Sequence, residues 1–325
     1  MTAAWTVSPS DETRHTPTDE DLWSESYYAD FVQEDGSLGG WLRLGMYPNR
    51  QVAWWTTYIV EPDRPGVCSV NYGLPVPAGT GLVTEDAATQ VTLEVRDPLQ
   101  EFRITASAAA TVLERPEQAY EVGGDSGGSP GSPGSPGAAA RLDLDLTWTT
   151  DGTPYHYILT PRYEIPCTVA GTITIDGAVM SIAGPGQRDH SWAARDWWAF
   201  GWCWSSARLD DGTRIHLSDI RVPGMPVFFG YVQPALGEVR PITALSVTEE
   251  AGAHGLPASA RIELSTGVGP DLAIAVTPLA YGPVLLRDDK SGRTSHFPRA
   301  MVHYEAEDGG SGLGWIEWNQ PDGAT

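Results

Sequence analysis

The stretch Trp202–Val222, WCWSSARLDDGTRIHLSDIRV, decides the fold class because it is the strongest β-hairpin signal in the chain. Two runs of alternating apolar and polar residues flank Asp211-Gly212, a dipeptide that favours a tight reversal. Similar strand-like runs follow one another along the rest of the sequence. The hairpin therefore predicts an antiparallel, all-β protein.

The length of the turn decides what the hairpin presents on each face. A two-residue turn puts Trp202 and Trp204 on one face together with Asp219. A three-residue loop puts the same tryptophans with His216 and Ser218, because a shift of one residue exchanges the two faces. Both registers place polar groups beside large aromatic rings on one side of a sheet.

Counting alternating runs outward from the hairpin gives about six or seven strands before Gly184 and about eight after it. We find no convincing helix of three turns, and the 36 Gly and 26 Pro fit many short connections. The polar and aromatic start, up to Phe31, is expected to be a short helix or a docked arm. We predict two β-barrels or sandwiches, covering residues 1–182 and 183–325.

Residues 122–140, VGGDSGGSPGSPGSPGAAA, are of low complexity and cannot bury a core. Strand-like patterns flank this segment closely on both sides. We therefore expect a flexible insertion between two strands of the first domain rather than a linker between domains.

The charge balance bears on partners and location. With 42 acidic and 20 basic residues the formal net charge is −22, which disfavours nucleic acid and anionic membrane surfaces. No apolar run reaches the roughly 18 residues of a membrane helix, and the first residues lack a secretory pattern. The three cysteines show no C-x-x-C spacing, so free thiols are expected. We expect a cytoplasmic protein without stable membrane insertion; the pattern indicates neither a monomer nor an oligomer.

The segment before the hairpin holds the candidate catalytic residues. Residues 184–206, GPGQRDHSWAARDWWAFGWCWSS, contain two Asp, two Arg, one His and five Trp. An Asp in an apolar, aromatic wall has a raised pKa and can donate a proton, and Trp faces stabilise positive charge. We expect Asp189 to be the acid, with His190 orienting it or handling water and Asp196 nearby. The alternative is that the Arg and Asp residues form structural ion pairs.

The same reasoning gives a set of candidate binding residues. A barrel lined this way suits a mostly apolar ligand held by a few polar atoms. We expect the tryptophans to shape the cavity, Arg195 and Asp219 to contact polar groups, and Glu317, between two tryptophans near the C-terminus, to meet the same cavity. The tryptophans concerned are Trp192, Trp197, Trp202 and Trp204.

A metal or cofactor is not expected. Asp189, His190, Asp196, His216 and Asp219 are possible ligand types, but no H-x-H or H-E-x-x-H spacing appears and two Arg lie among them. The glycines of GPGQRD do not follow the G-x-G-x-x-G nucleotide pattern, and no βαβ unit surrounds them.

Three segments together resemble the superfamily of carotenoid 1,2-hydratase (hydroxyneurosporene synthase) and AttH-like proteins, which includes actinobacterial members of unknown activity. They are residues 22–49, the central GPGQRDHSWAARDWW with WCWSSARLDDGTRIHLSD, and the closing GLGWIEWNQP. Asp189, His190 and Trp192 match the most recognisable positions, followed by Arg195-Asp196-Trp197. Ala193 departs from the expected S-W-G pattern.

The resemblance implies two lipocalin-like barrels packed together, with a cavity at or near their interface. It also implies several chemistries, since members are similar to carotenoid hydratases and, more distantly, to tocopherol cyclases and pericyclases. We expect acid-assisted hydration or cyclisation of a hydrophobic small molecule, such as an isoprenoid, steroid or polyketide. A non-catalytic carrier of lipophilic ligands and a shape-directed pericyclase remain the alternatives.

Overall fold

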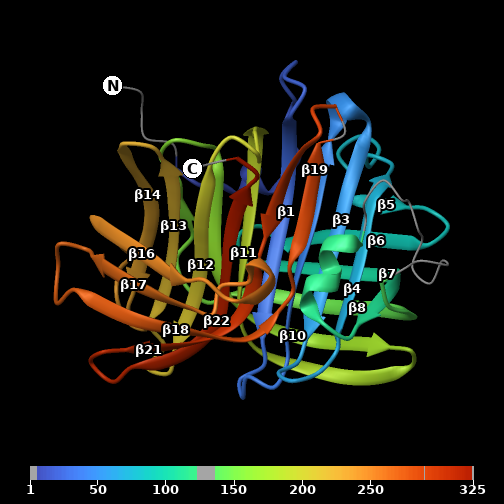
Figure 1. Cartoon of the computed structure of the whole chain (residues 1–325). Helices are drawn as coiled ribbons and strands as arrows, with labels where there is room; N and C mark the ends of the chain where they lie inside the picture. Colours follow the sequence, from blue (N-terminus) through green and yellow to red (C-terminus); the bar gives the residue numbers. More distant parts are fainter. Residues whose placement is uncertain (1–5, 123–135, 289, 324–325) are drawn as a thin grey trace.

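The computed structural model describes residues 6–122, 136–288 and 290–323, and its described part is almost entirely β. Two large antiparallel sheets curl side by side (Figure 1). The only helices in the described ranges are short 3-10 turns, at Pro9–Glu12, Pro48–Arg50, Pro116–Glu121 and Ala253–Gly255. The predicted all-β class, with two lipocalin-like barrels and little helix, is confirmed.

The first sheet contains the strands up to Ala194, β1 to β11. Its order is β4-β3-β2-β1-β11-β10-β8-β7-β6-β5, with β9 attached to β10. The end of β7 also pairs with β4, which closes the sheet into a barrel. The strands are β1 (Trp23–Val32), β2 (Gly39–Tyr47), β3 (Val52–Val60), β4 (Gly66–Leu74), β5 (Val83–Glu85), β6 (Thr89–Asp97), β7 (Glu101–Leu113), β8 (Ala138–Thr150), β9 (Tyr155–His156), β10 (Arg162–Ile175) and β11 (Ala178–Ala194).

The second sheet contains the later strands in the order β15-β14-β13-β12-β22-β21-β18-β17-β16, and the β19–β20 hairpin joins it through β22. Arg221 on β13 donates hydrogen bonds of 2.5 and 2.7 Å to Glu249 on β16, so the sheet curls until strands distant in its order meet. The strands are β12 (Gly201–Leu209), β13 (Arg214–Val222), β14 (Met225–Gln233), β15 (Arg240–Pro241), β16 (Ala244–Glu250), β17 (Ser259–Ser265), β18 (Leu272–Tyr281), β19 (Val284–Asp288), β20 (Arg293–Phe297), β21 (Arg299–Ala306) and β22 (Ser311–Pro321).

The predicted hairpin is β12–β13, and it takes the three-residue loop. The backbone N–H of Leu209 donates a hydrogen bond to the carbonyl of Thr213 across the loop. Gly212 has φ +83°, a conformation that glycine adopts without strain. Trp204 is therefore paired with Ser218 rather than with Asp219. The tryptophan face carries His216 and Ser218, and Asp219 lies on the opposite face with Cys203.

The aromatic start of the chain is a strand, so the expected short helix or docked arm is wrong. β1 lies between β2 and β11, and all of its residues are buried. Tyr27 and Phe31 face the interior of the first barrel, whereas Tyr28 packs against the second sheet. Because both faces are covered, the strand lacks the apolar–polar alternation by which a half-exposed strand is recognised.

The start of β8 and the end of β11 bear on the expected insertion and on the expected boundary between the two halves. Most of the low-complexity segment, residues 123–135, lies outside the described residues, but Ala138–Ala140 already belong to β8, which pairs with β7. The expected boundary at residue 183 lies inside β11, which pairs with β10 up to Ser191 and with β1 up to Ala194. We therefore propose residues 195–200 as the division between the two halves.

The two sheets are joined by a shared aromatic core. Trp41 of the first sheet donates a hydrogen bond of 3.0 Å to the carbonyl of Gly282, and Trp315 of the second donates one of 2.9 Å to the carbonyl of Phe31. Both rings are buried in a cluster that also holds Tyr28 and Met301. β1, β11, β12 and β22 run next to one another in the centre of Figure 1. Within the described residues, no helix has the length and apolar character needed to span a membrane.

Candidate active site

A pocket of about 360 Å³ lies between the two sheets. It collects side chains from β1, β2, β3, β10 and β11 on one side and from β12, β13, β14 and β19 to β22 on the other. Its apolar wall is mainly aromatic, formed by Trp41, Trp197, Trp202, Trp204, Phe229 and Phe297. Its charged lining consists of Arg43, Arg162, Asp189, Arg195, Asp196, Arg299 and Glu317.

Strand alternation in β11 separates the two residues that were expected to act together. Asp189 points into the pocket, whereas His190, its neighbour in the chain, points into the first barrel. There the His190 ring stacks on Tyr27 with the ring centroids 4.0 Å apart. His190 therefore does not contact the pocket, and the expected pairing of Asp189 with His190 is not formed.

Asp189 is a buried carboxyl group beside one guanidinium. Its Oδ2 accepts a hydrogen bond of 2.8 Å from Arg162 on the neighbouring strand β10. Burial raises the pKa of Asp189 to about 6; the charge of Arg162 opposes this rise and the carboxylate of Glu164 adds to it. A carboxylic acid with such a pKa holds a transferable proton under mildly acidic to neutral conditions.

A second layer of polar groups lies beneath Asp189. Arg162 also donates to Glu164, at 2.7 Å, and Glu164 accepts further hydrogen bonds from Trp204 (3.1 Å) and Gln187 (3.0 Å). Because Glu164 is fully buried, these hydrogen bonds replace those that its carboxylate would make to water. Arg162 is thereby held between two carboxyl groups, and its position beside Asp189 is fixed.

Tyr157 extends this layer to His216. The Nδ1 of His216 lies 3.0 Å from the carbonyl oxygen of Ser205 and donates to it, so Nε2 accepts a hydrogen bond of 2.8 Å from the Tyr157 hydroxyl. Burial and the charge of Arg162 hold the pKa of His216 well below its usual value, and burial raises that of Tyr157 well above its usual value. Both groups stay neutral, and the Tyr157 ring lines the pocket.

Trp197 lies under two guanidinium groups. The Cζ atoms of Arg43 and Arg195 lie 4.8 and 5.0 Å from the centroid of its ring. Burial first, and then the charge of Arg162, lower the pKa of Arg195 to about 10. Neither Arg43 nor Arg195 forms an ion pair with a carboxylate among the described residues. The pocket therefore has positive charge available for an oxygen atom of a ligand.

Glu317 reaches the same pocket, as the sequence predicted. It accepts a hydrogen bond of 2.9 Å from the Trp202 Nε1 and forms an ion pair with Arg299. The Arg299 guanidinium packs over Trp41, with Cζ 4.0 Å from the ring centroid. These contacts fix the orientation of the Trp202 ring and of the Glu317 carboxylate in the pocket lining.

The other predicted site residues fall at three places. Asp196 is at the edge of the pocket, where it pairs with Arg293 at 2.8 Å and stays partly exposed. Trp192 stacks on His15 in the first barrel, with ring centroids 3.6 Å apart. Asp219 lies outside the pocket lining because the three-residue loop turns it to the other face of β13. The described residues that could hold a metal ion, His15, Glu25 and His190, are also outside the pocket.

Several pocket residues were missed by sequence reasoning. Tyr157 lies in a connection and Arg162 is the first residue of β10, in a stretch without strand-like alternation; Arg299 follows a proline in the C-terminal half. Arg43 stands in a recognised strand but without an acidic neighbour to draw attention to it. Their roles depend on pairings between distant strands, which a single sequence does not reveal.

Comparison with known proteins agrees with this architecture. Residues 8–322 match the model of a protein family described as "Domain of unknown function (DUF7064)". No curated protein matches the sequence at a significant level.

Solved structures match over nearly the whole chain. A crystal structure of a protein assigned as AttH, from Nitrosomonas europaea, has a TM-score of 0.64 at 16% identity and covers 98% of each chain. CghA has a TM-score of 0.60 at 11% identity, covering 94% of this chain and 90% of its own. Kievitone hydratase from Nectria haematococca has a TM-score of 0.60 at 12% identity, covering 92% of this chain and 90% of its own. At these identities the likeness establishes the shared fold.

Proposed function

The chain belongs to the DUF7064 family, and we propose that it is an enzyme that uses Asp189 as a general acid on a hydrophobic small molecule. The reaction is the hydration or cyclisation of a carbon–carbon double bond. One observation carries this proposal: a buried carboxyl group with a pKa of about 6 faces a tryptophan-lined pocket between two barrels.

The chemistry follows from the surroundings of Asp189. Protonation of the substrate leaves a carboxylate, which Arg162 stabilises at 2.8 Å. Positive charge that develops on the substrate is stabilised by the faces of Trp202 and Trp204. The carbon is then captured by water, which gives hydration, or by a second double bond of the same molecule, which gives cyclisation. In both cases the resulting cation loses a proton to the Asp189 carboxylate, which restores the acid.

Two arginines of the pocket, Arg43 and Arg195, indicate what polar group the substrate carries. Arg43 and Arg195 place positive charge beside Trp197 with no carboxylate partner among the described residues. A purely hydrocarbon ligand would leave this charge uncompensated, whereas a carbonyl, phenol or carboxylate oxygen would accept hydrogen bonds from it. We therefore propose an apolar substrate with an oxygen acceptor near the reacting double bond. A volume of about 360 Å³ favours a ligand smaller than a carotenoid.

The solved relatives support a small-molecule role. Kievitone hydratase carries a hydratase activity in its name, and CghA has also been solved together with the small molecule Sch210972. Of the alternatives, a lipophile carrier predicts an apolar pocket with Asp189 outside it, and the position of Asp189 in the pocket lining disfavours it. A shape-directed pericyclase needs no proton donor. The activity of a variant without the Asp189 carboxyl group therefore distinguishes a pericyclase from the proposed acid catalyst.

The test uses a panel of apolar compounds whose double bond is conjugated to a carbonyl or a phenol. The full chain is expected to add water to, or cyclise, at least one compound, and in D₂O the product retains deuterium on carbon. Asp189→Asn should lower the rate by roughly 10²–10⁴-fold, the usual contribution of a general acid. The rate of the unchanged protein should fall as pH rises through about 6, because only protonated Asp189 donates.

Asp196→Asn is the matched control, since Asp196 is at the pocket edge and paired with Arg293. It should retain most of the activity. Full turnover by Asp189→Asn would overturn the proposal and favour the pericyclase. Binding of panel compounds without conversion of any of them would favour the carrier.

A further inference from the structure

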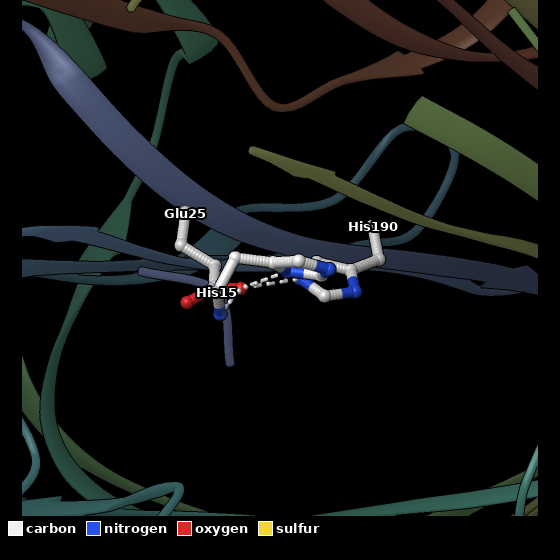
Figure 2. A group of neighbouring side chains, drawn as sticks. All are labelled: His15, Glu25 and His190. Carbon is white, nitrogen blue, oxygen red and sulfur yellow. Dashed lines mark hydrogen bonds and ion pairs between the residues drawn. The ribbon is translucent and has the colours of Figure 1, made fainter. Parts of the chain in front are cut away.

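Outside the pocket, three side chains with metal-binding atoms meet in the first barrel. Glu25 is on β1, His190 on β11, and His15 on the segment that precedes β1. Figure 2 shows the two imidazole rings directed toward the carboxylate of Glu25. Glu25 Oε1 lies 2.8 Å from His15 Nδ1 and 3.2 Å from His190 Nε2.

The hydrogen bonds of His190 determine which ring nitrogen carries its proton. Nδ1 lies 2.8 Å from the backbone carbonyl oxygen of Asp11, and a carbonyl can only accept, so Nδ1 is the protonated nitrogen. A lone pair on Nε2 would then face a carboxylate oxygen at 3.2 Å, and both atoms are acceptors. A metal ion between Nε2 and this carboxylate oxygen would accept both lone pairs.

Two distances between the ligand atoms match those around a metal ion: Glu25 Oε1 lies 2.8 Å from His15 Nδ1 and 3.2 Å from His190 Nε2. The three ligand atoms all lie within 4.8 Å of one another. Bonds of about 2.0–2.2 Å from zinc to imidazole nitrogen and carboxylate oxygen place neighbouring ligand atoms roughly 3 Å apart. Two imidazoles and one carboxylate form a ligand set that divalent transition metals such as Zn²⁺ prefer over Mg²⁺ or Ca²⁺.

Asp11 supplies for His190 the outer hydrogen bond that metal-binding histidines usually make, and it lies near the outer nitrogen of His15. Its carbonyl accepts from His190 Nδ1, and its Oδ1 lies 4.0 Å from His15 Nε2. A His15 ring that binds metal through Nδ1 carries its proton on Nε2, so one residue faces the outer nitrogen of both rings. This support points to a ligand role that a simple ion pair between His190 and Glu25 does not need.

Glu25 also has an oxygen to spare. Its Oε2 is buried and accepts no hydrogen bond among the described residues. The nearest cation is Arg14, whose Nε lies 3.7 Å away, while its Nη1 is held at 2.6 Å by the carbonyls of Pro77 and Gly79.

The charged groups around the cluster leave room for a cation. The acidic groups near the cluster are Asp11, Glu12 and Glu25, and the basic groups are Arg14 and Arg188. Arg188 forms an ion pair of 2.9 Å with Glu12. Three acidic groups against two basic ones leave a negative balance. A divalent ion adds charge of the sign that the surroundings favour.

We propose that His15, Glu25 and His190 bind one divalent transition metal ion, with Zn²⁺ as the probe. The ion connects the segment before β1 to β1 and β11. It lies on the opposite face of β11 from Asp189, so its role is to fix the N-terminal segment on the barrel rather than to act in the pocket. The side chain of His15 is 22% exposed, which gives the ion a route from solvent.

The experiment titrates chelator-treated full-length protein with Zn²⁺ by calorimetry and with Co²⁺ by visible absorption. We expect one ion per chain and a rise in the unfolding temperature on addition of Zn²⁺. His15→Ala should weaken binding on the order of 100-fold, because removal of an outer support alone costs about 10–100-fold. His15 is partly exposed, so this variant is expected to fold. His254→Ala, at an exposed histidine far from the cluster in sequence, should bind as the unchanged protein does.

Two measurements could overturn the proposal. The first is the Zn²⁺ titration, if the unchanged protein and His15→Ala bind with equal affinity or if neither binds. The other is an ¹⁵N spectrum in which both ring nitrogens of His190 stay protonated when Zn²⁺ is present, since that places a proton where the metal is proposed. This second measurement needs no variant and does not depend on catalytic activity.

Discussion

Asp30 shows how one buried carboxyl group makes stability depend on pH. Its carboxyl group accepts hydrogen bonds from the backbone N–H of Gln187 (2.8 Å) and from the hydroxyls of Tyr28 (3.0 Å) and Ser206 (3.2 Å). Because Ser206 belongs to the second sheet, Asp30 connects the two sheets. Burial outweighs these bonds and raises the pKa of Asp30 to about 7. The folded protein therefore holds this proton more tightly than the unfolded chain, whose Asp has a pKa of about 3.9.

The stabilisation from protonated Asp30 is complete below about pH 4 and is lost as pH rises through about 7. Asp30→Asn keeps a neutral side chain at every pH. Its free energy of unfolding, relative to the unchanged protein, should rise by up to about 4 kcal/mol between pH 4 and pH 8. Urea unfolding across this range measures the difference. Asp271→Asn, at an exposed aspartate, should give no such trend; a pH-independent effect of Asp30→Asn would contradict the argument.

At the residue scale, sequence reasoning selected several residues of the pocket lining but did not determine the direction of every side chain. Asp189, Trp197, Trp202, Trp204 and Glu317 were predicted from their aromatic surroundings, and all line the pocket. His190 was predicted as a partner because it adjoins Asp189 in the chain. In a strand, neighbours in sequence point to opposite faces, so adjacency argued against a shared site.

At the element scale, the β12–β13 loop decides which residues meet in the pocket. Its length was left open by the sequence, because Asp211-Gly212 fits both a two-residue turn and the end of a three-residue loop. The loop adopted turns Ser218 toward the pocket and Asp219 away from it. The elements themselves were predictable from alternation, whereas their register and the pairing of β1 with β11 depend on contacts between distant segments.

Gly212 tests this loop directly. Its φ of +83° is costly for residues with a Cβ, by about 1–2 kcal/mol, and least so for Asn. We expect Gly212→Ala to lower the free energy of unfolding by about that amount and Gly212→Asn to lower it less. A Cβ added here lies 2.9 Å from the Cβ of Ala235 in both variants, so their difference reports the backbone conformation. Equal losses in urea unfolding would mean that this contact, and not the loop conformation, sets the cost.

At the scale of the whole molecule, the aromatic core between the sheets makes the two halves depend on each other. Tyr28 and Trp41 of the first sheet are buried against Met301 and Trp315 of the second. The pocket lies within this contact and takes its walls from both sides. A pocket of defined shape therefore requires that the halves stay together, and neither half alone supplies both Asp189 and the tryptophans of β12.

The last prediction concerns the cooperativity that this shared core implies. Ile262 is 1% exposed in a cluster that belongs to the second sheet alone, so Ile262→Ala should cost about 2–5 kcal/mol. If the halves unfold as one unit, the slowest-exchanging amides of β3 and β8 in the first sheet should exchange faster by the same factor as those of β17 and β18. Hydrogen exchange followed by mass spectrometry measures both sheets at once. Faster exchange confined to the second sheet would show that the first barrel is stable by itself and that the pocket can open by separation of the two halves.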